Sequence, residues 1–246
     1  MKKLVIFDLD GTLIDTIIDA GRCFNKVLEQ FGFKTYPLEQ YNCLVGGNLE
    51  VIFSKLLEEQ YRTEEIIAKL KNKYREVYSL DPKPNTKPFN WILAVLEKLS
   101  EKDDVSIAIN TNKSQVLAEK LCEHMFSDIE FSGIFGYVDE RPSKPDPYAV
   151  NELMKINNVL PEETIYVGDS LTDIKTAQNA GIDCIFVNWL KADISALLAE
   201  NNVRFVANTP EDILTFLWLF LSKGGPKIKF YLEHLNFLRT EKNEEN

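Results

Sequence analysis

Two aspartates, Asp8 and Asp10, directly follow the apolar segment Leu4–Phe7 and come just before Gly11. Carboxylates placed two residues apart could hold a metal ion, and one could attack an electrophilic centre while the other moves a proton. Because the apolar segment does not alternate with polar residues, it predicts a strand that is buried on both faces of a parallel sheet. Open sheets of this kind bind ligands beyond the carboxyl ends of their strands, where the two aspartates would lie. Asp and Gly are also common in turns without function, so the pair needs support from elsewhere in the chain.

Further polar residues follow other predicted strands or precede helices. They are Thr111 and Asn112 after a strand expected over 105–110, Lys144 before a helix expected over 147–157, and Asp169 and Asp173 after a strand expected over 165–167. Since parallel strands all point the same way, their carboxyl ends would bring these side chains to one crevice beside the two aspartates. Taken singly, each has a simpler explanation, as a helix N-cap or as a solvated surface lysine. Their common position at the ends of successive elements favours a functional site.

The charges of the predicted crevice define what it could bind. The carboxylates of Asp8, Asp10 and Asp169 would repel one another unless a cation lay among them, and a few hard oxygen ligands with room for water suit Mg²⁺. Lys144 would add a second positive charge and Thr111 a hydroxyl donor, so that the site neutralises and positions a dianion. One aspartate could then attack phosphorus and form an aspartyl-phosphate, while the other handles the proton of the leaving group. These are the features of a site for phosphoryl transfer.

The elements that would carry these residues alternate between strand and helix in the second part of the chain. Strands are expected over 105–110, 134–138, 165–167, 184–187 and 203–206, and helices over 91–99, 114–126, 147–157, 173–180 and 210–221. Such alternation predicts an α/β fold, a doubly wound parallel sheet with a Rossmann-like core and helices on both faces.

Residues 16–86 follow a different pattern and predict a small helical domain inserted after the first strand. Apolar residues recur there at helical spacing in three stretches, and no strand pattern interrupts them. Three prolines between Asp81 and Pro88 then end the helical part. We therefore expect a discontinuous α/β core made of residues 1–15 and 87–225, with the helical domain between them.

The C-terminal end carries two further apolar stretches. Residues 216–221 are apolar without interruption, and the Gly-Gly-Pro sequence at 224–226 would end that helix. Residues 226–246 predict an amphipathic helix or tail. Its apolar face would be buried either on the core or against a second copy of the chain.

Composition argues against several other kinds of protein. The chain has 246 residues, of which 45% are hydrophobic and 27% charged, as is typical of a soluble globular protein. A net charge of -10 argues against sequence-independent binding of nucleic acid. We find neither a signal peptide nor an apolar stretch long enough to span a membrane, and we therefore expect a cytoplasmic location.

Taken together, the polar residues resemble the four motifs of the haloacid-dehalogenase (HAD) superfamily of phosphohydrolases. The matching segments are Asp8-x-Asp10-Gly11-Thr12, Thr111-Asn112, Lys144-Pro145 and Gly168-Asp169-x-x-x-Asp173. The helical insertion resembles the cap domain of the subclass that includes phosphoglycolate phosphatases, and the resemblance covers residues 1 to about 210. It implies a Mg²⁺-dependent phosphatase that hydrolyses a small phosphorylated metabolite, similar to phosphoglycolate, through an aspartyl-phosphate.

The resemblance also implies a role for each residue that touches the phosphoryl group. Asp8 would be the nucleophile and Asp10 the general acid and base. Thr111 and Lys144 would hold the phosphoryl group, and the backbone N–H of Asn112 could add a further hydrogen bond to it.

The metal and the cap have their own expected residues. Asp8, the backbone carbonyl of Asp10, and Asp169 would bind Mg²⁺. Asp173 would support these ligands without binding the metal directly. A small polar loop between cap helices would approach the substrate, or it could equally be a simple connecting turn. Its residues are Gly46, Gly47 and Asn48.

Other members of the superfamily stay open as alternatives. Dehalogenases lack an aspartate at the position of Asp10, so its presence indicates phosphoryl transfer. Phosphosugar mutases typically carry a histidine where this chain has Ala20 and an arginine near the cap loop, where it has Leu49, and both differences argue against a mutase. A nucleotide phosphatase, a pyrophosphatase and, with less support, a non-catalytic binding module are further alternatives. A homodimer formed through the cap or the C-terminal helix is also possible.

Overall fold

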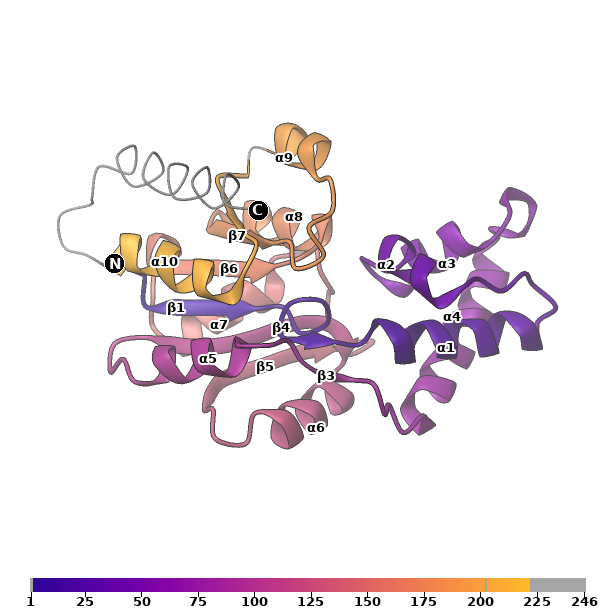
Figure 1. Cartoon of the computed structure of the whole chain (residues 1–246), viewed down its shortest axis with the longest axis horizontal. Helices are drawn as coiled ribbons and strands as arrows, with labels where there is room; N and C mark the ends of the chain where they lie inside the picture. The colour runs from indigo at the N-terminus through magenta and orange to yellow at the C-terminus, as the bar shows by residue number, and fades with distance from the viewer. Residues whose placement is uncertain (1, 202, 222–246) are drawn as a thin grey trace, which may run out of the picture.

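The computed structural model describes residues 2–201 and 203–221 and contains a six-stranded sheet (Figure 1). The strand order is β5-β4-β1-β6-β7-β8, which places β1 in the interior. The strands are β1 (Leu4–Phe7), β4 (Ser106–Ser114), β5 (Phe131–Tyr137), β6 (Thr164–Gly168), β7 (Asp183–Val187) and β8 (Phe205–Ala207). Every neighbouring pair runs parallel, which confirms the predicted α/β class and parallel sheet.

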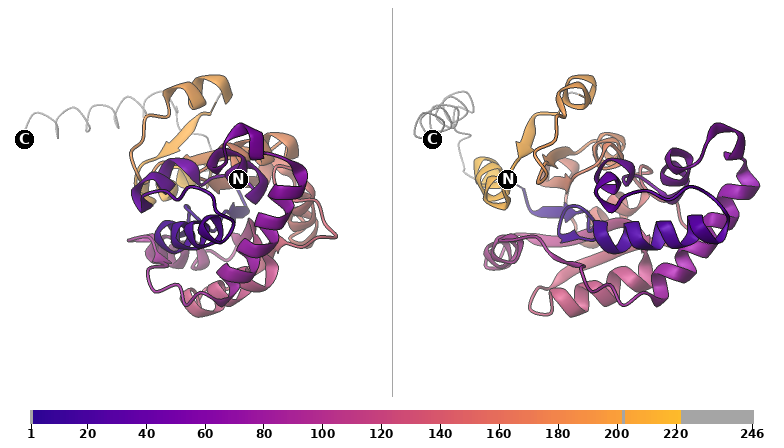
Figure 2. Two further views of the ribbon diagram at one scale, coloured as in Figure 1. Left: turned by 90° about the vertical axis from the view of Figure 1, so that its right-hand side faces the viewer. Right: turned by 45° about the vertical axis from the view of Figure 1, so that its right-hand side comes forward.

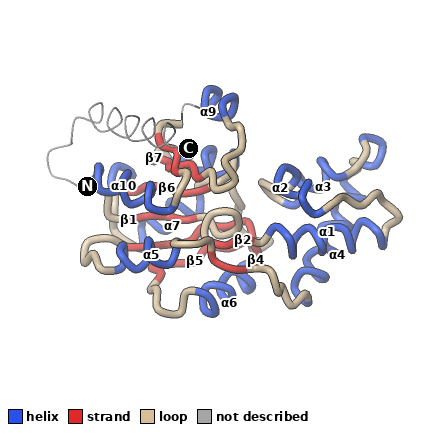
Figure 3. The backbone as a smooth tube through the Cα atoms, viewed as in Figure 1, coloured by secondary structure: helices blue, strands red, loops and turns tan. Residues whose placement is uncertain are grey.

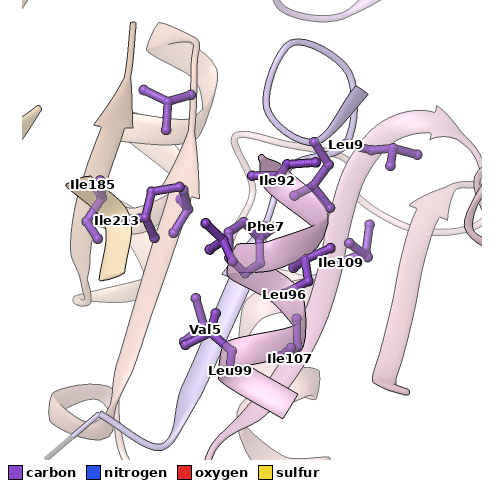
Figure 4. Packing of buried hydrophobic residues seen from close by; sticks show 14 of the residues in the cluster. Val5, Phe7, Leu9, Ile92, Leu96, Leu99, Ile107, Ile109, Ile185 and Ile213 are labelled. Carbon is purple, nitrogen blue, oxygen red and sulfur yellow. The ribbon is translucent and has the colours of Figure 1, made fainter. Parts of the chain in front are cut away.

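Helices cover both faces of this sheet. They are α5 (Ile92–Ser100), α6 (Gln115–Met125), α7 (Tyr148–Ile156), α8 (Leu171–Ala180) and α10 (Pro210–Leu221). The short helix α9 (Ser195–Asn201) has no buried residue. Because alternate strand residues point to opposite faces, Val5 and Phe7 share an apolar cluster with α5, α6 and α10 (Figure 4). Leu4 and Ile6 share another cluster with α7 and α8. β1 is thus buried on both faces, as its unbroken apolar sequence predicted.

A helical unit with a hydrophobic cluster of its own lies beyond the carboxyl ends of the strands (Figures 1 and 2). Its helices, which we call the cap, are α1 (Ile17–Gln30), α2 (Tyr41–Leu44), α3 (Leu49–Leu56) and α4 (Glu64–Leu80), with 3₁₀ turns at Leu38–Gln40 and Glu59–Tyr61. Aromatic rings fill its centre: Phe24 stacks on Tyr74 with ring centroids 4.0 Å apart and meets Phe53 edge to face at 5.3 Å. Figure 3 shows the cap as helices and loops without a strand.

Two segments join the cap to the sheet, and they pair with each other. β2 (Ile14–Asp15) and β3 (Lys87–Pro88) form an antiparallel ladder that the sequence patterns did not predict. Beside it, the buried carboxylate of Asp19 accepts hydrogen bonds from the Asn85 backbone N–H (2.9 Å), the Asn85 amide (2.8 Å) and the Thr86 hydroxyl (2.8 Å). Burial alone would favour the neutral acid, but these hydrogen bonds hold the pKa of Asp19 below its ordinary value. Asp19 therefore fastens the second connecting segment to the first helix of the cap.

Replacing this carboxylate (Asp19→Asn) is expected to lower the free energy of unfolding by about 3 kcal/mol, because an amide N–H would face the donors of Asn85 and Thr86. The native pKa is lowered, so Asp19 stabilises the fold at neutral pH, and this contribution is lost as the pH falls below about 4. Urea denaturation of both proteins from pH 7 to pH 3 measures the effect, and the difference between them should shrink at the acid end. Asp15→Asn is the control, because Asp15 accepts one hydrogen bond, from Ile17 N, that an amide oxygen can also accept. Equal losses in the two variants would contradict the assignment.

Several boundaries differ from the expected ones. β4 continues past its predicted end at residue 110, because after an irregularity in register Ser114 pairs with Tyr137 of β5. The short helix α9 was not expected, whereas α10 over 210–221 was. The amphipathic helix or tail predicted over 226–246 lies outside the described residues. Among the helices that the structure describes, none combines the length and apolar character needed to cross a bilayer.

Candidate active site

A buried lysine lies between two carboxylates at the carboxyl end of β1. Lys144 Nζ is 2.9 Å from Asp8 Oδ1 and 2.6 Å from Asp173 Oδ1, and only 3% of the Lys144 side chain is exposed. Asp8 directly follows β1, and Asp173 lies in the first turn of α8. Burial opposes the positive charge, but the carboxylates of Asp173 and Asp8 raise the pKa of Lys144 well above its ordinary value. The structure therefore places a fixed ammonium group beside Asp8.

Two glycines allow the aspartates to come this close. At Gly11, whose φ is +82°, a Cβ atom would lie 2.4 Å from Asp169 Oδ2, and at Gly168 it would lie 2.4 Å from Asp173 Cγ. A side chain at either position would displace a carboxylate. Thr12 donates a hydrogen bond to Asp169 Oδ1 at 3.1 Å. The loop after β1 thus also orients this second strand-end carboxylate.

The carboxylates of Asp8, Asp169 and Asp173 each offer an oxygen within 4.8 Å of the others, a spacing that fits one metal ion. Burial and the neighbouring carboxylates raise the pKa of Asp169 well above its ordinary range, and they raise that of Asp8 to about 7 although Lys144 opposes the shift. Asp8 Oδ1 is buried, and among the described residues its partner is the Lys144 ammonium. Both oxygens of Asp173 are already hydrogen-bonded, one to Lys144 and one to Ser170. Asp8 and Asp169 therefore fit the hard oxygen ligands that Mg²⁺ prefers, and Asp173 fits a supporting position.

The irregular end of β4 lies beside these groups. Thr111 is buried, and its Oγ1 accepts a hydrogen bond from Lys113 N at 3.3 Å. The side chain of Asn112 bonds to the Lys144 backbone: Nδ2 donates to O at 3.3 Å and Oδ1 accepts from N at 3.1 Å. Asn112 thus holds the loop that carries Lys144. The amide nitrogen of Asn110 is buried and has no hydrogen-bond partner among the residues that the structure describes. The sequence patterns did not single out this residue, because it ends an otherwise apolar segment.

Asp10 stands outside the group of three carboxylates and pairs with a lysine that the sequence analysis did not single out. Lys113 Nζ lies 3.0 Å from Asp10 Oδ1, and the exposed fractions of the two side chains are 6% and 31%. Burial opposes the charge of Lys113, but Asp10 and Tyr78 raise the pKa of the ammonium above its ordinary value. Lys113 directly follows the Thr111-Asn112 motif, and this proximity in the sequence was the signal that could have pointed to it.

The cap loop that we expected near the substrate lies against the start of α8. A Cβ atom at Gly47 would lie 3.4 Å from Thr172 Oγ1. Asn48 is the N-cap of α3, where its Oδ1 accepts a hydrogen bond from Val51 N at 3.0 Å, and a Cβ at Gly46 would have no neighbour within 4 Å. The loop therefore reaches the edge of the site through Gly47, while the Asn48 side chain serves the cap helix.

Replacing Gly47 by valine (Gly47→Val) is expected to raise KM by about tenfold or to change substrate preference, because the loop would have to withdraw from Thr172, and small displacements at a site can cost up to about 10²-fold. Kinetics over a panel of phosphate esters measure the effect. Gly47 has a φ of +90°, so the variant also strains the backbone. Gly32→Val is the matched control, since Gly32 lies in the cap at a φ of +73° with nothing within 4 Å of its Cβ position. Identical kinetics in the two variants would place the loop outside the site.

Comparison with known proteins agrees with this geometry. Residues 5–187 match the model of the haloacid dehalogenase-like hydrolase family. The chain is 30% identical over 185 residues to the phosphoglycolate phosphatase of Aliivibrio fischeri, covering 73% of this chain and 81% of that protein. It is 26% identical over 215 residues to the phosphoglycolate phosphatase of Aquifex aeolicus, covering 87% of this chain and 96% of that protein.

Solved structures show the same fold. A haloacid dehalogenase-like hydrolase from Streptococcus pneumoniae superposes with a TM-score of 0.76 at 24% identity, over 88% of this chain and 98% of that one. The fold, the family match over most of the chain and the assembled aspartates, lysine and threonine agree with one another. The chain belongs to the haloacid dehalogenase-like hydrolases and is a phosphatase of that family, a phosphoric monoester hydrolase.

Proposed function

We propose that this phosphatase hydrolyses a small phosphomonoester similar to phosphoglycolate, with Mg²⁺ as cofactor and with an aspartyl-phosphate intermediate on Asp8. The observation that carries the proposal is the buried Asp8 carboxylate, whose Oδ1 lies 2.9 Å from the Lys144 ammonium and has no other partner among the described residues. A nucleophile and a charge that neutralises its target therefore stand side by side. The relatives named phosphoglycolate phosphatase support this class of substrate.

Asp8 attacks phosphorus along the line of the bond to the leaving oxygen, forming a P–O bond to its carboxylate as the P–O bond to the substrate breaks. Lys144 and the Thr111 hydroxyl bind the non-bridging oxygens and hold the phosphoryl group while its charge shifts. Bound by Asp8, Asp169 and the backbone carbonyl of Asp10, Mg²⁺ would neutralise part of the charge of the phosphate and let the crowded carboxylates stay ionised.

Asp10 transfers the proton in both steps. In the first step, its protonated carboxyl donates a proton to the leaving alkoxide, which departs as an alcohol. In the second step, the resulting carboxylate removes a proton from water, which attacks the aspartyl-phosphate and releases phosphate from Asp8. Asp10 is protonated again at the end of this step, so the cycle closes.

The cap supports a substrate of modest size. Its loop at Gly47 lies against Thr172, so the cap adjoins the site and could exclude bulk water during the reaction. Ala20, at the position where mutases typically carry a histidine, is buried in the hydrophobic cluster of the cap, which argues against the mutase alternative. A small metabolite as substrate also agrees with the cytoplasmic location expected from the sequence.

A screen of phosphate release over a panel of phosphorylated metabolites tests the proposal, with Mg²⁺ and with a chelator. We expect small phosphomonoesters, phosphoglycolate among them, to be hydrolysed with Mg²⁺ and to lose nearly all turnover with the chelator. Preferential hydrolysis of nucleotides or of pyrophosphate would replace the proposed substrate class. Full activity with the chelator would remove Mg²⁺ from the proposal.

A further inference from the structure

Lys113 is a buried cation that the proposed chemistry does not use. Its Nζ pairs with Asp10 Oδ1 at 3.0 Å, and 6% of its side chain is exposed. Asp10 Oδ1 is itself buried and has no partner other than this ammonium among the described residues. The position of the Lys113 ammonium therefore determines which orientation of the Asp10 carboxyl group is electrostatically favourable.

The other contact of Lys113 belongs to the cap. Lys113 Nζ donates a hydrogen bond to the Tyr78 hydroxyl at 3.1 Å and lies 4.5 Å from the centre of the Tyr78 ring. Tyr78 is a residue of α4, and its ring stacks on Tyr74 at 5.4 Å, which in turn stacks on Phe24 at 4.0 Å. Lys113 thus touches the aromatic core of the cap on one side and the Asp10 carboxylate on the other.

We propose that Lys113 is a positioning residue that, through its contact with Oδ1, holds the Asp10 carboxyl group in its working orientation in both protonation states while Tyr78 of the seated cap is in contact with Lys113. When the cap moves away, Tyr78 leaves, and Lys113 loses its hydrogen bond and the ring that covers it. Water then reaches the ammonium, which weakens its pull on Asp10 and frees the carboxylate to turn. Proton transfer is thereby confined to the closed state, in which the substrate is enclosed. This inference rests on the proposed phosphatase chemistry.

A second cap contact provides a control of the same kind. Arg75, also a residue of α4, lies 4.5 Å from the centre of the Tyr137 ring at the end of β5 and 3.9 Å from Asp139. Like the contact of Lys113 with Tyr78, it joins a cation and an aromatic ring across the boundary between cap and core. It makes no contact with Asp10 or with the other carboxylates of the site. Loss of this contact should loosen the cap without disturbing Asp10.

The test compares Lys113→Met, Tyr78→Phe and Arg75→Met with the unaltered protein, using phosphoglycolate and nitrophenyl phosphate with Mg²⁺. An alkoxide needs a proton from Asp10, whereas nitrophenolate scarcely does. Lys113→Met should therefore lower the single-turnover rate of phosphoryl transfer from phosphoglycolate by about tenfold to a hundredfold more than the rate from nitrophenyl phosphate, a part of the full effect of a general acid. Tyr78→Phe, which keeps the ring and its stacking, should change this ratio in the same direction by less. Arg75→Met should leave the ratio unchanged.

A double variant separates positioning from other roles. If Lys113 acts through Asp10, adding Lys113→Met to Asp10→Asn should not change the ratio of the rates for the two substrates any further. Equal losses on both substrates in the first, phosphoryl-transfer step, or effects of the two substitutions on that step that multiply, would overturn the inference. A rise confined to KM for phosphoglycolate would make Lys113 a binding residue for the substrate carboxylate and would overturn it as well. If the unaltered protein hydrolyses no phosphate ester at all, the proposed function fails first, and that result is distinct from an active protein whose ratio does not respond to Lys113.

Discussion

Replacing the proposed nucleophile by asparagine (Asp8→Asn) is expected to lower kcat by roughly 10⁶-fold, to the limit of detection. A neutral amide oxygen is a poor nucleophile, and the proposed metal site loses an anionic ligand. Phosphate release from phosphoglycolate and from nitrophenyl phosphate measures the loss. Activity should fall equally toward both substrates, because the bond between Asp8 and phosphorus cannot form with either of them.

The same variant should remain folded. Burial raises the pKa of Asp8 to about 7, so at higher pH the ionised carboxylate destabilises the metal-free native state relative to a neutral amide. Lys144 keeps its ion pair with Asp173 at 2.6 Å. We therefore expect Asp8→Asn to melt at or above the temperature of the unaltered protein at pH 8 in a chelating buffer. A folded variant that kept full turnover would falsify the assignment of the nucleophile.

Replacing the second aspartate (Asp10→Asn) should slow hydrolysis of an alkyl phosphate by about 10²–10⁴-fold, the usual contribution of a general acid or base. Unlike Asp8→Asn, this variant keeps its nucleophile. Formation of the aspartyl-phosphate from nitrophenyl phosphate should therefore be less affected than formation from phosphoglycolate, because nitrophenolate leaves without a proton. Burst kinetics of nitrophenolate release measure this first step directly.

The second step gives Asp10→Asn a chemical signature. Hydrolysis of the aspartyl-phosphate needs a base to activate water, so this variant should accumulate the intermediate. Rapid quenching with a labelled aryl phosphate, followed by peptide mapping, should place the label on Asp8. Label on Asp10 in the unaltered protein would reverse the two roles.

Much of this site can be predicted from the sequence, because the patterns that predict it involve residues close together in the chain. Four apolar residues followed by Asp8 are enough to specify a strand buried on both faces that ends in a carboxylate. The alternation of strands and helices then specifies a parallel sheet, which brings the ends of β1, β4 and β6 to one edge. Asp8, Lys144 and Asp173 meet there within ion-pair distance, as that reasoning requires.

The sequence patterns do not predict the contacts between segments that lie far apart in the chain. Asp19 bonds to Asn85 across 66 positions, and Lys113 bonds to Tyr78 across 35. Each side chain, considered alone, is typical of a helix surface or a strand end. Contacts with distant segments also determine which hydrogen bonds a polar side chain makes. The amide of Asn112, for example, bonds to the Lys144 backbone.

The sequence by itself thus determined the fold class, the order of the elements and the carboxylates at the strand ends, because hydrophobic periodicity and chain direction depend only on neighbouring residues. The tertiary structure decided which oxygens are already hydrogen-bonded, where β4 ends, and how the cap is fastened to the core. Those features depend on the free energy of groups that meet only when the chain has folded: desolvation, pairing of buried charges and satisfaction of buried donors. Lys113 lies one residue beyond the motif that resemblance to the family supplied, and its neighbours Asp10 and Tyr78 give it a role that its position in the sequence could not.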